Sequence, residues 1–141
     1  MVMVTFYSAT YSLTPLPDAI NDILGHDLAG WLRAGLVERG YDATPVIGED
    51  YGYGFHLRLN RAYYWISVSM ADGETDPPQW AVGLDLDPGC LWIWRLKARP
   101  QKGDKQAIAR SIHALLLGEP GITRIEWWRQ AVGQGTPTAE P

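Results

Sequence analysis

The chain has little cysteine and no long apolar run. Cys90 is the single cysteine among 141 residues, so no intramolecular disulfide can form and a secreted disulfide scaffold is excluded. No stretch reaches the roughly 18 apolar residues that a membrane-spanning helix needs. The first residues, MVMVTFYSATYSL, lack the basic segment of a secretion signal. We therefore expect a cytoplasmic protein that does not contact the membrane.

Phenylalanine is also scarce, with 2 residues against 7 tryptophans and 7 tyrosines. Tryptophan and tyrosine join an apolar ring to a polar tip, so they suit half-buried positions and interfaces as well as a small core. Hydrophobic residues make up 46% of the chain, enough for the core of one domain.

Basic residues are too few for a general nucleic-acid binder. The net charge is -4, whereas nucleic-acid binding needs a basic surface that releases counterions. One basic stretch, Arg95 to Lys105, lies near Trp92 and Trp94, but Asp87 and Asp104 flank it. We expect no nucleic-acid partner.

Hydrophobic periodicity predicts two helices and a run of strands. Apolar residues at helical spacing predict helices over residues 27–39 and 104–117. His26 or Asp27 and, in the second helix, Asp104 are the expected N-caps, and Gly40 and Gly118 the expected ends. Alternating residues predict strands at 2–7, 55–60, 62–70, 79–87, 90–96 and 122–129, with a short extended piece at 44–48.

The element order β-α-β-β-β-β-β-α-β predicts an α+β fold. We expect a single, mainly antiparallel sheet of about six strands with both helices on one face. Residues 1–130 would form this domain, and residues 131–141, rich in glycine, proline and threonine, a flexible tail. Strand parity places a polar and aromatic set on the opposite face: His56, Arg58, Tyr63, Trp65, Asp85 and one of Trp92 or Trp94.

The sequence contains no recognisable catalytic or cofactor motif. Asp72, Glu74 and Asp76 are spaced like the start of a calcium loop, but two prolines follow and Gly83 occupies the position of the last ligand. The three histidines lack metal-ligand spacing, and a hydrogen bond from His56 to Asp85 or Asp87 is expected instead. Cys90 has no nucleophile-elbow context, although a pair with His56 stays open. We expect no metal, no cofactor and no enzymatic activity.

The segments GWLRAGLVERGY, GEDYGYGFHLRL and ITRIEWW resemble a group of small standalone bacterial proteins of largely unknown function. In that group an acidic-aromatic-glycine turn follows the first helix. Here the turn reads Glu49-Asp50-Tyr51-Gly52-Tyr53, with tyrosines in place of tryptophans. The resemblance covers roughly residues 27–128. Some of these proteins resemble immunity proteins that neutralise a toxin, which implies a protein partner and no catalytic residues.

Three functions follow as hypotheses. The first is an immunity- or inhibitor-type protein that occludes a protein partner, possibly a toxin, through its aromatic sheet face. Its expected contact residues are Asp50, Tyr53, His56, Arg58, Trp65, Asp85 and Trp92. The second is a small enzyme or small-molecule binder with a pocket near His56 and Asp85. The third is a self-associating regulatory or structural domain, in which case a homodimer forms.

Overall fold

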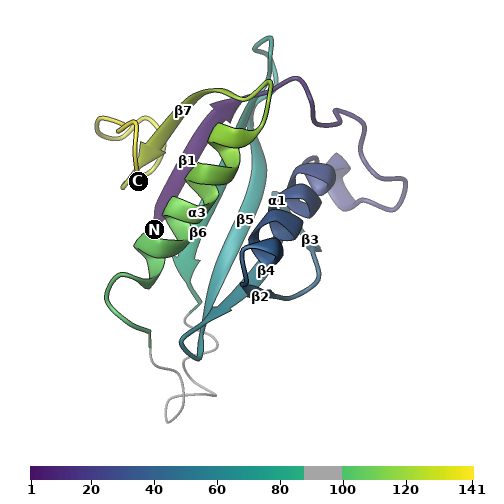
Figure 1. Ribbon diagram of the computed structural model, residues 1–141. Coiled ribbons are helices and arrows are strands. Elements are labelled where there is room, and N and C mark those ends of the chain that lie inside the picture. Colours follow the sequence, from purple (N-terminus) through teal and green to yellow (C-terminus); the bar gives the residue numbers. More distant parts are fainter. Residues whose placement is uncertain (88–99) are drawn as a thin grey trace.

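A seven-stranded antiparallel sheet carries two helices on one face (Figure 1). The computed structural model describes residues 1–87 and 100–141. The α+β class and the predicted antiparallel sheet are confirmed. The strand predicted at 90–96, with Cys90, Trp92 and Trp94, lies outside the described residues.

The strand order places the first strand near the end of the sheet, next to the last strand. The strands are β1 (Val2–Tyr7), β2 (Asp42–Ala43), β3 (Ile47–Glu49), β4 (Gly52–Leu59), β5 (Ala62–Asp72), β6 (Gln79–Leu86) and β7 (Thr123–Trp128). Their order is β2-β4-β5-β6-β1-β7, and β3 also pairs with β4. The central part is therefore a β4-β5-β6 meander, and β1 lies between β6 and β7.

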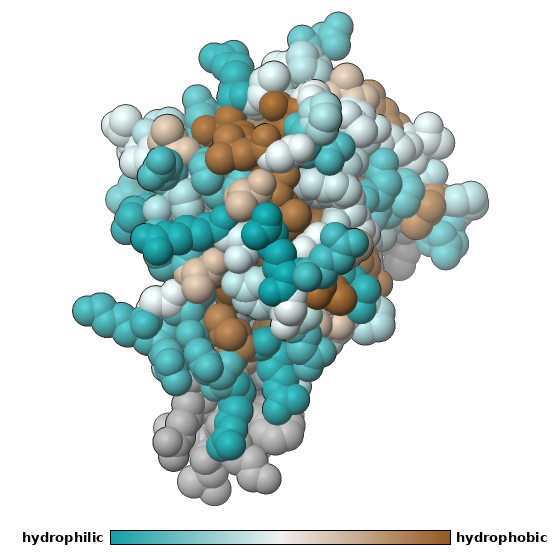
Figure 2. All heavy atoms as spheres, viewed as in Figure 1, coloured by the Kyte–Doolittle hydropathy of each residue, from teal (hydrophilic) through white to brown (hydrophobic). Residues whose placement is uncertain are grey.

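The helices cover the sheet with the apolar stripes that the sequence predicts. They are a short 3-10 turn η1 (Ile20–Asp22), α1 (His26–Glu38) and α3 (Asp104–Gly118). Alternate strand residues form the other half of the core, and the largest fully buried side chains include Phe6, Leu28, Leu32, Phe55, Tyr64, Ile66, Trp80 and Ile112. Fully burying one such side chain stabilises the fold by about 1.5–3 kcal/mol. On the outer surface of the helices, hydrophobic residues show only as separate groups among polar ones (Figure 2).

The helix ends differ in part from the prediction. Gly40 ends α1 as expected, with φ +96°, and the amides of Gly40 and Tyr41 bond the carbonyls of Val37 and Leu36. The predicted side-chain N-caps are wrong, because Gly25 and Gly103, both in the left-handed region, occupy those positions. A glycine reaches this conformation without strain, and it redirects the chain into the helix.

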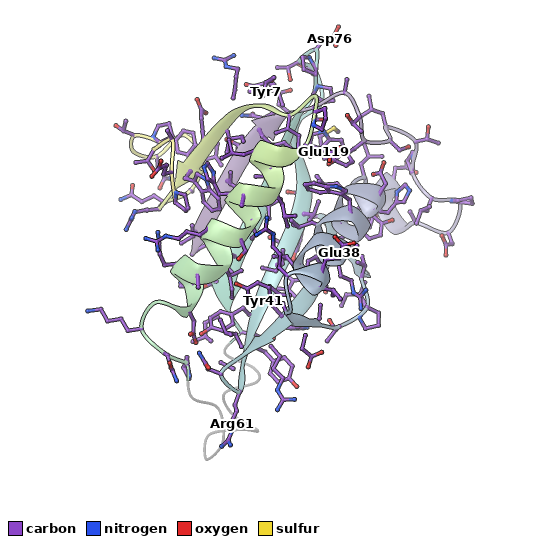
Figure 3. All side chains as sticks on the ribbon, viewed as in Figure 1. Tyr7, Glu38, Tyr41, Arg61, Asp76 and Glu119 are labelled. Carbon is purple, nitrogen blue, oxygen red and sulfur yellow. The ribbon has the colours of Figure 1, made fainter. Side chains whose placement is uncertain are left out.

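Asp104 begins α3 as a buried anchor. It is 5% exposed and accepts hydrogen bonds from Tyr64 Oη (2.7 Å), Asn60 Nδ2 (2.8 Å) and the Gln101 amide (2.8 Å). Between β4 and β5 the chain turns at Asn60-Arg61, with φ of 50° and 63°, and Arg61 projects from the tip of this hairpin (Figure 3). Asp104 thus fixes the start of α3 to the β4–β5 hairpin.

A second contact joins the far end of α1 to α3. Tyr41, just beyond the end of α1, lies beside α3 (Figure 3), and its hydroxyl is 3.0 Å from Ser111 Oγ.

Within the described residues, no helix is long and apolar enough to cross a membrane.

The two edges of the sheet are both partly covered. On β4, the Thr44 hydroxyl accepts the His56 amide at 2.9 Å, which fills the gap between β2 and β3. On β7, the Trp127 amide and carbonyl bond Thr138 at 2.8 and 2.9 Å. Part of the tail that the sequence predicts to be flexible therefore contacts the outer strand; its flexibility stays a prediction.

Candidate functional site

The face of the sheet away from the helices, here the helix-free face, brings the predicted polar and aromatic residues together. The pairing register aligns His56 of β4 with Trp65 of β5, and Trp65 with Asp85 of β6. The next row pairs Arg58 with Tyr63. Since alternate residues of a strand share one face, these five side chains lie on the same side, as strand parity predicts.

Trp65 lies flat over its neighbouring strand because that strand has a glycine there. A Cβ built on Gly54 would lie 2.2 Å from Trp65 Cζ2, so only glycine leaves room for the ring. The indole Nε1 donates to the hydroxyl of Tyr51 at 3.0 Å. Tyr51 is 53% exposed at the tip of the β3–β4 hairpin. The exposed Tyr51 ring thus ties the hairpin tip to the half-buried Trp65 on the sheet face.

A histidine–carboxylate pair adjoins this aromatic pair. His56 Nε2 lies 2.6 Å from Asp87 Oδ2, and the imidazole centroid is 4.8 Å from that of Trp65. The side chains of His56 and Asp87 are 26% and 23% exposed, so the pair is only partly open to water. Asp85 is more exposed and meets Lys105 Nζ at 3.4 Å. Asp87, one of the two partners expected from the sequence, is the one that bonds His56.

These side chains surround a hollow of about 440 Å³, here called the aromatic hollow. Its lining residues include Ile47, Glu49, Tyr51, His56, Trp65, Asp85 and Asp87. Its volume falls within the range of about 300–1,000 Å³ that is usual for ligand pockets. Aromatic walls with a few polar groups at the rim are suited to a flat or aliphatic side chain that carries a hydrogen-bonding group.

A second hollow lies between the β3–β4 hairpin and the chain that leads into α1. Its volume is about 280 Å³, and it is here called the acidic hollow. It is lined by Leu16, Asp18, Ala19, Ile23, Gly48, Glu49, Asp50 and Tyr53. Glu49 lines both hollows, so the two adjoin at the hairpin.

Tyr53 has an unusual position in the acidic hollow. Its side chain is 7% exposed and meets the His26 ring edge-on at 6.0 Å. Its hydroxyl forms no hydrogen bond within the described parts of the chain. Burial, and then the nearby carboxylate of Asp18, raise the pKa of Tyr53, so the phenol stays protonated and can donate or accept.

The predicted contact residues therefore separate into groups. His56, Arg58, Trp65 and Asp85 share the helix-free face. Asp50 and Tyr53 belong to the acidic hollow. Tyr53 has the parity of the buried Phe55 and Leu57, so this placement was readable from the alternation. Trp92 lies outside the described residues.

Three further residues of the helix-free face and its rim were not among the predicted contacts. Tyr51 was treated as part of a turn, and Asp87 only as a possible partner of His56. Trp128 adds a third: it is half-buried on the helix-free face and donates to Thr5 Oγ1 at 3.0 Å, while its neighbour Trp127 is buried. The adjacent tryptophans 127 and 128 in a predicted strand indicate one ring on each face of the sheet, because neighbouring strand residues face opposite ways.

The site has the groups for binding more clearly than those for catalysis. Over residues 1–87 and 100–141, no three histidine, cysteine or acidic side chains are grouped to hold a metal ion. In the same ranges, the His56 ring meets Asp87 as its hydrogen-bond partner and no nucleophilic side chain. A histidine held by a carboxylate can exchange a proton, but a reaction also needs a group for it to activate.

Comparisons with protein-family models, with curated proteins and with solved structures found no match to this chain, so the function is inferred from its geometry.

Proposed function

We propose that this chain is a non-enzymatic protein-binding domain of the immunity or inhibitor type, which occludes a protein partner through its helix-free face. The observation that carries the proposal is the row His56–Trp65–Asp85, which sets a half-buried aromatic ring between a histidine and a carboxylate beside the aromatic hollow. Trp65 and Tyr51 supply rigid apolar area, and Arg58, Asp85 and Glu49 form a charged rim. Aromatic anchors inside a polar rim are typical of binding hot spots.

The aromatic hollow defines what the partner would present. An apolar or aromatic side chain fits against Trp65 and Ile47, and a hydrogen-bonding group at its end reaches the His56–Asp87 pair. Such an anchor, removed from water at the centre of an interface, typically contributes about 2 kcal/mol or more to binding.

The test is a comparison of variants in one capture experiment from the source bacterium. Immobilised wild-type protein is compared with the double variant Trp65→Ala/Arg58→Ala and with Leu117→Ala, whose side chain is 66% exposed on α3. A protein retained by wild type and by Leu117→Ala through a high-salt wash, but lost with the double variant, supports the proposal. Its affinity is then measured with purified components.

Equal capture by all three proteins would show that the helix-free face is not the binding surface. Recovery of the chain as a clean monomer with no partner would count against the immunity-type function itself. Thermal unfolding of each variant confirms that a lost interaction does not come from a lost fold.

A second function, binding of a small molecule, is favoured by the same hollow. His56, Asp85 and Asp87 converge in one cavity of about 440 Å³ with an aromatic wall. Binding would shift the indole NMR signal of Trp65, because its Nε1 hydrogen bond to Tyr51 closes one side of the hollow. A fragment library that leaves this signal unchanged would leave protein binding as the better function.

Self-association is the third candidate and can be measured directly. A symmetric dimer through the helix-free face would bury Trp65, so light scattering should show twice the monomer mass for wild type and the monomer mass for Trp65→Ala. A monomer in both cases removes this candidate.

A further inference from the structure

We propose that the acidic hollow binds the cationic end of an arginine or lysine side chain of the protein partner. The inference deepens the proposed function by naming the chemistry of the partner, and the cation binding itself can be tested without that partner. It rests on three features of the hollow: unpaired carboxylates, an unpartnered tyrosine hydroxyl and an apolar floor.

The carboxylates of Asp18, Glu49 and Asp50 all line the hollow, and all three residues are exposed. None of the three has an ion pair or a side-chain hydrogen bond within the part of the chain that the structure describes. By contrast, Asp85 and Asp87 of the aromatic hollow are both paired. Negative charge is thus concentrated without compensation on one side of the hairpin, where a cation from outside would offset it.

Tyr53 provides the second feature. More than nine-tenths of this residue is buried, and its ring is fixed against His26 and beside Gly48, whose added Cβ would lie 3.6 Å from Tyr53 Cε1. Its hydroxyl has no hydrogen-bond partner in the described residues and is not one of their buried polar atoms, so it is open to the hollow. A guanidinium or ammonium group in the hollow would donate a hydrogen bond to it.

The size and lining of the hollow favour an alkyl cation over a metal ion. Calcium and magnesium need several oxygens within about 2.0–2.6 Å, and the described residues hold no such group of acids. A guanidinium carries five N–H donors that reach acceptors spread around it. Leu16, Ala19 and Ile23 line the same hollow, where an aliphatic stem would pack. About 280 Å³ is below the usual range for a drug-sized ligand, which suits a single side chain.

The neighbouring hollow explains why the cation would belong to a protein. Glu49 lines both hollows, so a partner that covers the β3–β4 hairpin would insert one side chain on each side of it. The hairpin, residues 47–54, would then lie at the centre of the interface.

The experiment is an NMR titration of the full chain with two capped amino acids. Nα-acetyl-arginine methylamide carries the cation, and the citrulline analogue has nearly the same shape but no charge. We expect saturable shifts of the backbone amides of residues 18–19 and 48–53 with the arginine compound, and none with the citrulline compound. Glu49→Gln/Asp50→Asn should weaken the binding about tenfold, and Tyr53→Phe about threefold. Asp42→Asn, an exposed acid on β2 outside the hollow, should leave it unchanged.

Equal shifts with both compounds, or shifts that survive the double variant, would overturn the inference. Agmatine, which has the guanidinium but no backbone, is the third probe. If it binds far more tightly than the capped arginine, the hollow serves a free small cation and not a partner side chain. Loss of cation binding while Trp65-dependent capture persists would overturn this inference alone. Cation binding with no protein partner in the capture experiment would instead count against the proposed function.

Discussion

Two tyrosines on neighbouring strands have different roles: Tyr53 of β4 lines the acidic hollow, whereas Tyr64 of β5 stabilises the fold. Both face the helices and both are buried. The Tyr64 hydroxyl donates to Asp104, a buried carboxylate at the start of α3, whereas that of Tyr53 has no partner in the described residues. Phenylalanine at the two positions therefore removes the same atom with different consequences.

We predict that Tyr64→Phe lowers the free energy of unfolding by about 1–3 kcal/mol, because Asp104 loses a hydrogen bond in a buried position. Tyr53→Phe should change it by less than about 0.5 kcal/mol. Urea denaturation of both variants measures the difference. A Tyr53→Phe cost as large as that of Tyr64→Phe would mean that the Tyr53 hydroxyl does have a partner.

Gly54 is the residue that shapes the aromatic surface. We predict that Gly54→Ala destabilises the fold by about 1–3 kcal/mol, because its Cβ would lie 2.2 Å from the Trp65 ring and 2.7 Å from the Ile66 carbonyl oxygen. It should also shift the Trp65 indole signal by breaking the Trp65–Tyr51 hydrogen bond. A variant with wild-type stability and an unchanged indole signal would contradict this account of the surface.

At the scale of elements, α1 keeps two glycines for different reasons. Close packing requires a glycine at Gly35 alone. A Cβ on Gly35 would lie 2.7 Å from Leu115 Cδ2, whereas a Cβ on Gly30 would meet nothing within 4 Å. Gly35 thus allows α1 to approach α3, and Gly30 only weakens the helix.

We predict that Gly30→Ala raises the free energy of unfolding by about 0.5–1 kcal/mol, the gain in helix propensity. The free energy of unfolding of Gly35→Ala should lie clearly below that of Gly30→Ala, because the added Cβ displaces Leu115 and this offsets the gain in helix propensity. The double variant Gly35→Ala/Leu115→Ala tests the cause: the cost of the two changes together should be smaller than the sum of the single costs. Additive costs would show that the two residues are not in conflict.

Alternation predicts the strands of the meander well, since β4, β5 and β6 each bury one face against the helices. Phe55, Ile66 and Val82 all face the core as expected. The β2–β3 edge was harder, because a strand of two or three residues has no readable period, and here the Thr44 hydroxyl replaces part of the ladder. The order of the strands depends on contacts between distant residues, on which local patterns carry no information.

The candidate site was predictable to the same extent. The alternation of side chains along each strand was enough to place His56, Arg58, Trp65 and Asp85 on one face. The hydrogen bond from Trp65 to Tyr51 and the choice of Asp87 over Asp85 depend on side-chain reach and on the hairpin bend, so they required the structure.

At the scale of the whole molecule, buried tyrosines link stability to high pH. Burial raises the pKa of Tyr11 and Tyr64; nearby carboxylates raise it further, Glu119 and Asp27 for Tyr11 and the hydrogen-bonded Asp104 for Tyr64. An unfolded tyrosine ionises near about pH 10. Below that pH both states hold the proton and the stability is fully present; above it the unfolded state releases protons first and is favoured.

We therefore predict that the free energy of unfolding falls as the pH rises from about 10 towards the raised pKa values of the folded chain. Urea denaturation at several pH values between 8 and 11.5 measures the slope. Tyr64→Phe should make this decline shallower, because one of the two tyrosines with a raised pKa is then absent. A stability that stays constant over this range would contradict the assignment of these two tyrosines.

The position of β1 between β6 and β7 has a consequence for how the chain is made. Val4 pairs with Val82 on one side and with Trp127 on the other, so β1 is completed only by β7, the last strand of the sheet along the chain. The β4-β5-β6 meander needs only local contacts and can assemble early, with α1 already available to cover it. Pairing across such long sequence separations is slow. Until β7 is synthesised, one edge of β1 therefore stays unpaired, and a chaperone that meets the growing chain would find an apolar strand edge there.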